Sequence, residues 1–355
     1  MSAVVALDLR DAPLALRRVA GLPLCVRNAI LAHRGGAREI VLLGDGDGRA
    51  RGVLGPELAR RRIETPVRAA ADAGELPPGA IVWPADLFVG RRAPVPLDRV
   101  VGAPDHDWIR VRDGASLRKA EQALMRSLRK PEDGVVARFN RYVSLALSRP
   151  LLDTPVSPNS ISVLALLVGV LCGVLAATGR RPEMVVGAFL FWFNCVLDGI
   201  DGEIARAKHL ESHLGEWLDT ICDDLTNFSF AVGLGIGLFR QTGHAHYIAL
   251  GGASGAAVLI CAAFMYRYLL RAGTGDLNAY RLPHEGRASS TTPGALSRWI
   301  ARLRVLVRRD VFCAVAFLLA VADQLPLMSW LMAIGGTAMW TTIAVETVLA
   351  VGRRS

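Results

Sequence analysis

Residues 198–223 read DGIDGEIARAKHLESHLGEWLDTICD, and this stretch places four carboxylates at the ends of two apolar segments. Asp198 and Asp201 are three residues apart, and Asp219 and Asp223 are four apart, so each pair lies on one face of a helix. A short polar turn between the two helices brings these faces together, and the four carboxylates then converge. Because carboxylates beside apolar helices are costly to bury, the arrangement indicates a function.

The chemistry of this cluster favours metal and phosphate. Four carboxylates repel one another unless cations bind, and oxygen-only ligands select Mg²⁺, Mn²⁺ or Ca²⁺ rather than zinc. Helical geometry projects Arg206 and Lys208 near the first pair, where a basic group suits a phosphate that bridges to the metal. Spacing alone leaves two alternatives, a transporter with a proton or cation path and helix-end charges without a role.

Three small residues fit the same interpretation. Gly202 and Gly215 cost ~1 kcal/mol each relative to Ala inside a helix, so they predict close approach of a backbone or a ligand. Ser212, on the turn before Gly215, is a candidate donor to a phosphate.

Outside this stretch the chain divides into two unlike halves. Its 355 residues suggest about two domains, and 52% hydrophobic residues with a mean hydropathy of +0.34 are high for a soluble enzyme. From about residue 160 onward, six windows without charge predict six membrane-spanning helices, with flanking polar turns completing the shorter ones. These windows are Ile161–Thr178, Met184–Leu197, Leu225–Phe239, Tyr247–Tyr266, Val311–Ala322 and Leu325–Val345.

The distribution of charge predicts the orientation. The chain carries 41 Lys and Arg residues against 32 Asp and Glu residues. Within residues 267–309 there are nine arginines and two acidic residues. Excess basic charge marks the cytoplasmic side, although an anionic lipid or substrate surface is the alternative reading of this segment. Residues 1–16 lack a cleavable signal sequence. We therefore expect a multi-pass protein of a bacterial cytoplasmic membrane, with the N-terminal half and the active site facing the cytoplasm.

Three further features complete the organisation. Six scattered cysteines without a CxxC pair indicate buried residues rather than a zinc site. Residues 138–152 interleave Arg with apolar side chains, which is typical of a helix in the membrane interface or of an ordinary linker helix. Ser157-Pro158-Asn159 supplies a turn and a helix cap before the first span. We expect a cytoplasmic domain over 1–110, a linker with the interfacial helix over 111–159, and a six-helix all-α membrane domain over 160–351.

The eight fixed positions of residues 198–223 resemble the signature of the CDP-alcohol phosphotransferases, D-x2-D-G-x2-A-R-x8-G-x3-D-x3-D. The resemblance covers residues 134–351 and implies transfer of a phosphoalcohol from a CDP-alcohol to an acceptor hydroxyl, with release of CMP. It also implies roles for individual residues. One or two Mg²⁺ or Mn²⁺ ions would bind to the cluster of Asp198, Asp201, Asp219 and Asp223, and Asp223 would also be the general base. The CDP group would be held by Asn159, Gly202, Arg206, Ser212 and Gly215.

The N-terminal half alternates helical and strand patterns. A helical stretch to about Gly36, a buried strand over 39–44 and a second over 80–86 predict an α/β domain of Rossmann type. This half is similar to nucleotidyltransferases, whose glycine-rich loop cradles the nucleotide phosphates. The corresponding stretch here is Ala6–Pro13 and contains no glycine, and a lone Asp86 is typically structural. We therefore expect a degenerate domain that no longer makes a CDP-alcohol.

The order of the two domains resembles the bifunctional inositol-1-phosphate cytidylyltransferase and di-myo-inositol-phosphate-phosphate synthase proteins. This indicates a donor of the CDP-diacylglycerol or CDP-inositol type and an alcohol acceptor. The candidates to bind a phosphate on this acceptor are Lys130, Arg138 and Arg141. The alternative is that these residues form a solvated basic face. The expected partners are membrane lipids and a second copy of the chain, and we expect no nucleic acid to bind. Residues 251–255 (GGASG) are expected to make a close helix contact. The alternatives are a bifunctional enzyme, a carboxylate-lined transporter and a soluble polyprenyl-diphosphate enzyme.

Overall fold

The structure, a computed structural model, describes residues 4–90, 108–129, 134–275 and 309–351, with side chains as far as Ala338. The chain forms two compact units, each with its own core. The first unit comprises Met1–Pro131, Ser148–Pro155 and Glu203–Leu210, and the second comprises Glu132–Leu147, Val156–Gly202 and Glu211–Ser355.

A parallel sheet forms the centre of the first unit. Its four strands lie in the order β5-β4-β1-β6, with the bounds Val67–Ala70, Glu39–Leu43, Val4–Asp8 and Ile81–Pro84. Val5 pairs with Ile40 on one side and with Ile81 on the other. Chain order reverses between β1 and β6, so the crevice at their carboxyl ends is the usual ligand position in such sheets.

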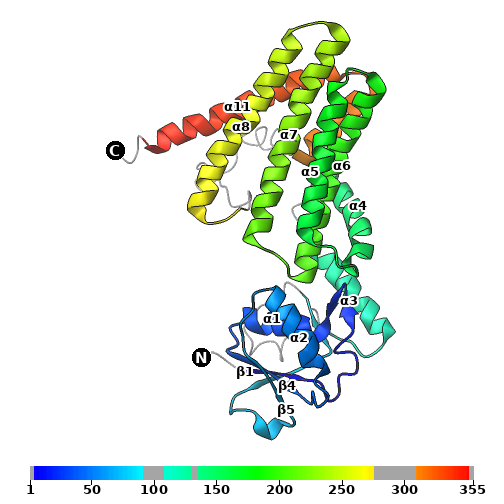
Figure 1. The fold of residues 1–355 in the computed structure, drawn as a ribbon, viewed down its shortest axis with the longest axis vertical. Coiled ribbons are helices and arrows are strands. Elements are labelled where there is room, and N and C mark those ends of the chain that lie inside the picture. Colours follow the sequence, from blue (N-terminus) through cyan, green and yellow to red (C-terminus); the bar gives the residue numbers. More distant parts are fainter. Residues whose placement is uncertain (1–3, 91–107, 130–133, 276–308, 352–355) are drawn as a thin grey trace, which may run out of the picture. The chain divides into compact units, whose positions relative to one another are not determined.

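Side-chain alternation along the strands gives this sheet two buried faces. Val5 and Leu7 of β1 join a core with helices α1 (Leu24–Arg34) and α2 (Arg49–Arg60), while Val4 and Ala6 point to a second cluster. Figure 1 shows both helices beside β1 and β4. The predicted helix and the buried strand over 39–44 are therefore confirmed, whereas the second predicted strand is present as β6 but buries only Trp83 and leaves Val82 exposed.

Short elements complete this unit. A hairpin is formed by β2 (Arg18–Val19) and β3 (Leu22–Pro23), and an antiparallel pair by β7 (Leu87–Val89) and β8 (Trp108–Arg110), with a 3₁₀ turn over Ala73–Glu75. The helix α3 (Gly114–Ser127) begins with a capping box in which Asp113 Oδ1 accepts from the Ser116 amide at 2.7 Å. One part of the sequence interpretation changes, because residues 6–8 of the expected loop are strand residues of β1 and the loop starts at Leu9.

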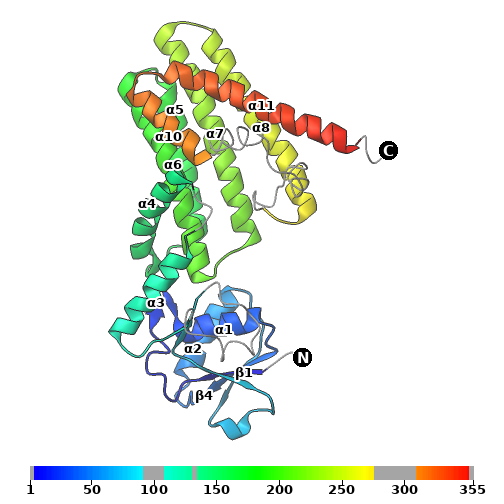
Figure 2. The ribbon, with the colours of Figure 1, turned by 180° about the vertical axis from the view of Figure 1, so that it is seen from behind.

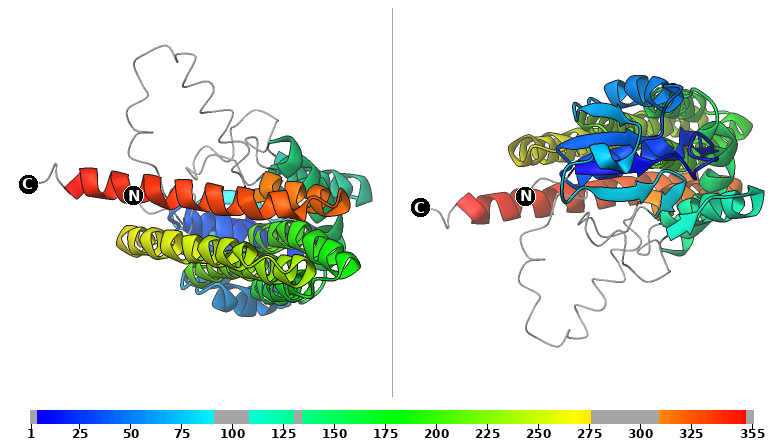
Figure 3. Two further views of the ribbon diagram at one scale, coloured as in Figure 1. Left: turned by 90° about the horizontal axis from the view of Figure 1, so that it is seen from above. Right: turned by 90° about the horizontal axis from the view of Figure 1, so that it is seen from below.

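The second unit is helical. Its helices, two of which continue into the first unit, are α4 (Val135–Leu152), α5 (Pro158–Ala177), α6 (Arg181–Lys208), α7 (His213–Thr242), α8 (His246–Ala272), α10 (Arg309–Val321) and α11 (Leu325–Val351). The helices α5 and α8 pack on α7, as Figure 1 shows, and α6 contacts α7 through stacked Phe191 and Phe230 rings whose centroids are 4.2 Å apart. Figures 2 and 3 show α11 running beside α8.

The predicted apolar windows lie in these helices, except that Thr178 and Ala322 directly follow the ends of α5 and α10. Within the described residues, α5, α6 and α8 are long and apolar enough to cross a bilayer. Ser157 caps α5 as expected, because its Oγ accepts from the Ser160 amide at 3.2 Å. Leu167 and Val174 of α5 are among the large apolar side chains that stay exposed on this unit.

Glycines bring the central helices into backbone contact. A Cβ at Gly233 would lie 2.1 Å from the Gly173 carbonyl oxygen, and one at Gly237 would lie 1.9 Å from that of Ala176, so α5 and α7 touch through their main chains. On the other side of α7, a Cβ at Gly251 would come within 2.9 Å of the Gly235 Cα. The GGASG segment therefore makes a close helix contact inside the chain.

Candidate functional site

The carboxylates are positioned by the connection between α6 and α7. The helix α6 ends at Lys208 and α7 begins at His213, with Ser212 as its N-cap. His209 has a φ of 52°, and this left-handed conformation, unusual for a residue other than glycine, reverses the chain. The predicted short polar turn between two helices is therefore present.

Three of the four expected carboxylates form one group. Each of Asp198, Asp219 and Asp223 offers an oxygen atom, and these atoms lie within 4.8 Å of one another. All three side chains are half-buried, so these open carboxylates keep some exposure to solvent. An oxygen-only donor set at this spacing fits Mg²⁺ or Mn²⁺.

Asp201 has a more enclosed position. It is buried, and its Oδ2 accepts a hydrogen bond from Ser162 Oγ on α5 at 2.5 Å. The spacing of the sequence gave no indication of this serine, because α5 comes from a different part of the chain. Ser162 therefore fixes the direction of the Asp201 carboxylate.

Arg309 brings a guanidinium to the same group. It is the first residue of α10; its Nη1 forms a close ion pair with Asp223 Oδ2 and lies 3.7 Å from Asp198 Oδ1. Its Nη2 donates to Asn194 Oδ1 at 3.0 Å. The sequence interpretation counted Arg309 only as part of the basic segment and missed this contact.

Asn194 connects this arginine to the helix scaffold. Its side chain is buried on α6, and its Nδ2 donates to the Ala165 carbonyl at 2.5 Å while its Oδ1 accepts from Arg309. An asparagine in an otherwise apolar window is the one sequence signal that pointed here, because a polar side chain at this depth needs partners.

Three of the residues expected to hold CDP, namely Asn159, Ser212 and Gly215, lie close together. Ser212 Oγ accepts from the Gly215 amide at 3.1 Å, which leaves its hydroxyl proton free to donate elsewhere. A Cβ on Gly215 would lie 3.2 Å from Ser212 Oγ and 3.5 Å from Asn159 Oδ1, so glycine keeps the space between these two side chains open. Gly202 and Arg206 are half-buried near the end of α6.

The other basic candidates fall in different places. Lys208 Nζ donates to the Thr154 carbonyl at 2.6 Å, so this ammonium is engaged by backbone, contrary to the expectation that it joins the phosphate site. Arg141 lies beside Gly199, the residue that follows Asp198 in the chain. A Cβ on Gly199 would be 3.5 Å from the Nη1 atom of Arg141. Arg138 is exposed, and Lys130 lies outside the described residues.

A fifth carboxylate, Asp224, was not anticipated. It follows Asp223 in the chain, and its Oδ2 accepts from the Tyr266 hydroxyl of α8 at 2.7 Å. Nearby, Glu216 Oε2 accepts from the Gly275 amide at 3.1 Å. These two contacts tie the N-terminal half of α7 to the end of α8.

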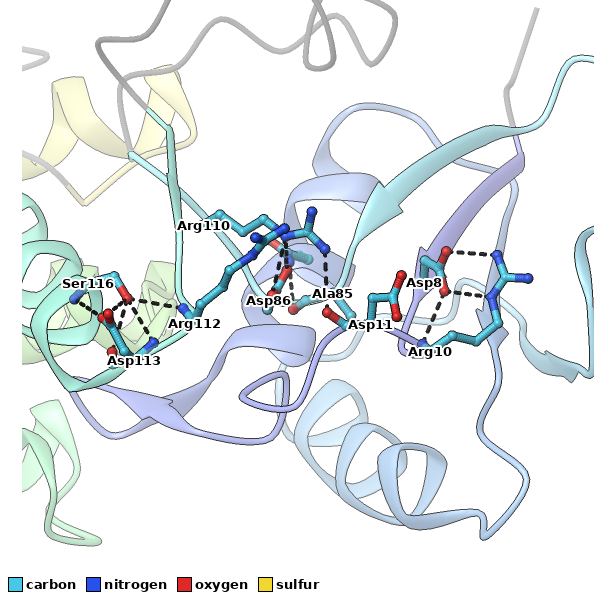
Figure 4. A network of polar contacts seen from close by, with 10 residues as sticks. Asp8, Arg10, Asp11, Ala85, Asp86, Arg110, Arg112, Asp113 and Ser116 are labelled. Carbon is cyan, nitrogen blue, oxygen red and sulfur yellow. Dashed lines mark hydrogen bonds and ion pairs between the residues drawn. The ribbon is translucent and has the colours of Figure 1, made fainter.

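The carboxyl edge of the sheet in the first unit also carries charge, which Figure 4 shows. Arg10 donates to both Asp8 oxygens, at 2.9 and 2.8 Å, and this pairing lowers the pKa of Asp8. Asp86 is fully buried and pairs with Arg110 at 3.2 Å. Asp45 accepts from the Ala50 and Arg51 amides and occupies the α2 N-terminus.

Comparison with known proteins gives one family. The family model described as CDP-alcohol phosphatidyltransferase matches residues 155–348, more than half of the chain. A bifunctional IPC transferase and DIPP synthase of Aquifex aeolicus is 32% identical over 152 residues, 42% of this chain and 34% of the relative. The protein of that name in Rubrobacter xylanophilus is 35% identical over 156 residues, 43% and 34% of the two chains.

A third relative carries a different name. A CDP-diacylglycerol–serine O-phosphatidyltransferase of Mycobacterium leprae is 32% identical over 84 residues, which is 24% of this chain and 27% of the relative. The chain therefore spans about a third or less of the length of these relatives.

Proposed function

The chain belongs to the CDP-alcohol phosphatidyltransferase family, and from this premise we propose that it is a membrane enzyme that transfers a phosphoalcohol from a CDP-alcohol to an acceptor hydroxyl, releasing CMP. The observation that carries the proposal is the group of Asp198, Asp219 and Asp223, which lies where the matched region and the signature residues coincide.

The carboxylates supply the setting for the reaction. Asp198, Asp201 and Asp219 would hold one or two Mg²⁺ or Mn²⁺ ions, which neutralise the charge of the pyrophosphate. Among the described residues, Ser162 orients Asp201, and the three open carboxylates present oxygen ligands only. This donor set fits such an ion.

Asp223 is the proposed general base. It accepts the proton of the acceptor hydroxyl as that oxygen forms a bond to the phosphorus bearing the alcohol, and the bond from this phosphorus to the bridging oxygen breaks, so CMP leaves. The ion pair with Arg309 directs the Asp223 carboxylate into the group. Asn159, Gly202, Arg206, Ser212 and Gly215 would hold the CDP group.

The surroundings proposed for this site are a bilayer. Six of the helices from α5 to α11 would span it, with the active site and the N-terminal half facing the cytoplasm of a bacterium, and the family resemblance supports a homodimer. Support comes from the three helices of sufficient length and from α4, which exposes Phe139 and Tyr142. Arg138 and Arg141, with Lys130, are proposed for the phosphate of the acceptor.

The α/β domain is proposed to be non-catalytic. The arginines at the sheet edge contact its carboxylates, and the amides at the α2 N-terminus are already satisfied by Asp45. A bifunctional enzyme, the second candidate, is favoured by the names of the relatives from Aquifex and Rubrobacter. Incubation of the purified chain with CTP and inositol phosphate, followed by assay of pyrophosphate, distinguishes the two.

The test of the transfer reaction is CMP release in liposomes. The purified protein is given Mg²⁺ or Mn²⁺, either CDP-diacylglycerol or CDP-inositol, and one acceptor at a time from glycerol phosphate, inositol phosphate, inositol and serine. We expect acceptor-dependent CMP from wild type and none from Asp219→Ala. Absence of CMP with both donors and every acceptor would refute the proposal and favour a transporter.

A further inference from the structure

The first unit contains more than the α/β domain. It includes Ser148–Pro155 and Glu203–Leu210, which contain the C-terminal ends of α4 and α6. The second of these segments is the end of the helix that carries Asp198 and Asp201. The contacts within this unit therefore show how the α/β domain holds that helix end.

Arg61 makes the central contact. Its Nε and Nη2 both donate to the Lys208 carbonyl, at 3.1 and 2.8 Å. Lys208 is the last residue of α6, and carbonyls in the last turn of a helix have no partner within the helix. The planar guanidinium therefore caps α6 with a charged donor.

The same guanidinium is fixed at its other edge. Arg61 Nη1 donates to the Glu57 carbonyl at 2.7 Å and pairs closely with the Glu57 carboxylate, so Arg61 caps α2 and α6 together. Its side chain is only 4% exposed. An arginine held on both edges and shielded from water has little freedom, so it transmits the position of α2 to α6.

Three further contacts surround this one. Lys208 Nζ donates to the Thr154 carbonyl, and Glu203 accepts a short hydrogen bond from Ser148 Oγ, which joins the ends of α4 and α6. Gly21, in the turn between β2 and β3, has a φ of 78°, and a Cβ there would lie 1.9 Å from the Leu152 carbonyl oxygen. The α/β domain thus meets the end of α4 through backbone and that of α6 through Arg61.

We propose that Arg61 is a positioning residue, through which the α/β domain fixes the last turn of α6 and the adjoining turn to Ser212 for binding of the CDP group. This inference rests on the proposed function. It assigns the α/β domain a part in transfer without nucleotide chemistry of its own. Arg206 lies within this turn, whereas Asp198 lies more than two turns earlier, so loss of the cap acts on nucleotide binding rather than on the metal.

The test compares three variants in the full-length protein in liposomes. Arg61→Ala removes the cap, and Arg61→Lys keeps the positive charge without the planar set of N–H donors. Arg60→Ala changes the exposed neighbouring arginine and serves as a matched control. We expect Arg61→Ala to raise KM for the CDP-alcohol about tenfold with kcat within about twofold of wild type, since a lost charged hydrogen bond has this size. Arg61→Lys should recover part of the loss.

Hydrogen–deuterium exchange provides a readout that does not depend on activity. The Leu210 amide donates to the Ala205 carbonyl at 2.8 Å and reports on the last turn of α6. It should exchange about tenfold faster in Arg61→Ala than in Arg60→Ala. If Arg61→Ala does not fold, Arg61→Lys gives the same comparison with smaller changes.

Two results separate the proposals. Equal exchange and equal KM in the Arg61 and Arg60 variants would overturn the positioning role. Faster exchange in an Arg61 variant, together with no CMP from wild type, would refute the proposed function while leaving the structural contact established, and would overturn the assignment of Arg61 to transfer.

Discussion

At the edge of the sheet, Asp8 and Asp86 each contact an arginine of their own, whereas Asp198 and Asp223 share Arg309 and form one group with Asp219. The residue types are the same in both regions. They differ in the ratio of carboxylates to guanidinium groups, because, within the described part of the chain, the three carboxylates share the ion pairs of a single arginine and leave an excess of negative charge. Balanced pairs stabilise a fold, and an unbalanced group needs a cation.

The comparison also explains why only one region is suited to catalysis. Asp86 is fully buried behind Arg110, while the three open carboxylates are half-buried and keep some exposure to solvent. The four predictions below change this balance, and they run from the largest expected effect to the smallest.

Asp219→Ala removes one of the three open carboxylates. We expect CMP release to fall by a factor of about 10³ or more, because the charge that holds the metal is lost. Binding of Mn²⁺, followed by its electron paramagnetic resonance signal, should weaken in parallel. Wild-type Mn²⁺ affinity in this variant would contradict the assignment of Asp219 as a ligand.

Asp223→Asn preserves the shape of the side chain but removes its charge and basicity. Transfer should fall by a factor of about 10²–10⁴, the usual contribution of a general base. Calorimetric titration should still detect CDP-alcohol binding in the presence of Mg²⁺. Loss of donor binding equal to the loss of transfer would assign Asp223 to the substrate complex instead.

Arg309→Ala leaves the carboxylates without their nearby guanidinium. We expect Mn²⁺ to bind several-fold more tightly, because the negative charge rises, while transfer falls about tenfold as Asp223 loses its partner. Arg309→Lys should keep the metal affinity near wild type. Weaker Mn²⁺ binding in the alanine variant would show that Arg309 organises the ligands rather than competing with the ion.

Arg10→Ala breaks a balanced pair in the other region. Because the Arg10 contact lowers the pKa of Asp8 in the folded state, its stabilisation is present above the unfolded value of about 3.9 and disappears as the pH falls through the folded value. This exposed pair makes only a small contribution to stability near neutral pH. Thermal unfolding of wild type and variant from pH 7 to 3 should show a small difference that closes at the acid end, with unchanged transfer.

The sequence predicted what depends on short-range pattern. The strand over 39–43, the cap at Ser157 and the two carboxylate pairs follow from alternation, capping preference and helical spacing, all of which act over a few residues. Each of these predictions is confirmed as local structure.

The missed features depend on contacts between distant parts of the chain. Arg309 reaches Asp223 from a helix 86 positions later, and Ser162 reaches Asp201 from a helix 39 positions earlier. No local pattern encodes such contacts. The misassigned Lys208 has the same cause, since its ammonium finds backbone carbonyls at the end of α4 that helical geometry alone does not reveal.

The glycine contacts of α7 have a consequence for the choice of ion. With α5 and α8 both in main-chain contact with it, α7 has little room to rotate or shift, so Asp219 and Asp223 on α7 are held in place against these two helices. Mg²⁺ requires short, nearly octahedral ligand distances, whereas Ca²⁺ accepts longer and looser ones. We therefore expect the close packing at Gly173, Gly233 and Gly235 to favour the smaller ion, and enlarging those side chains should shift the preference toward the larger one.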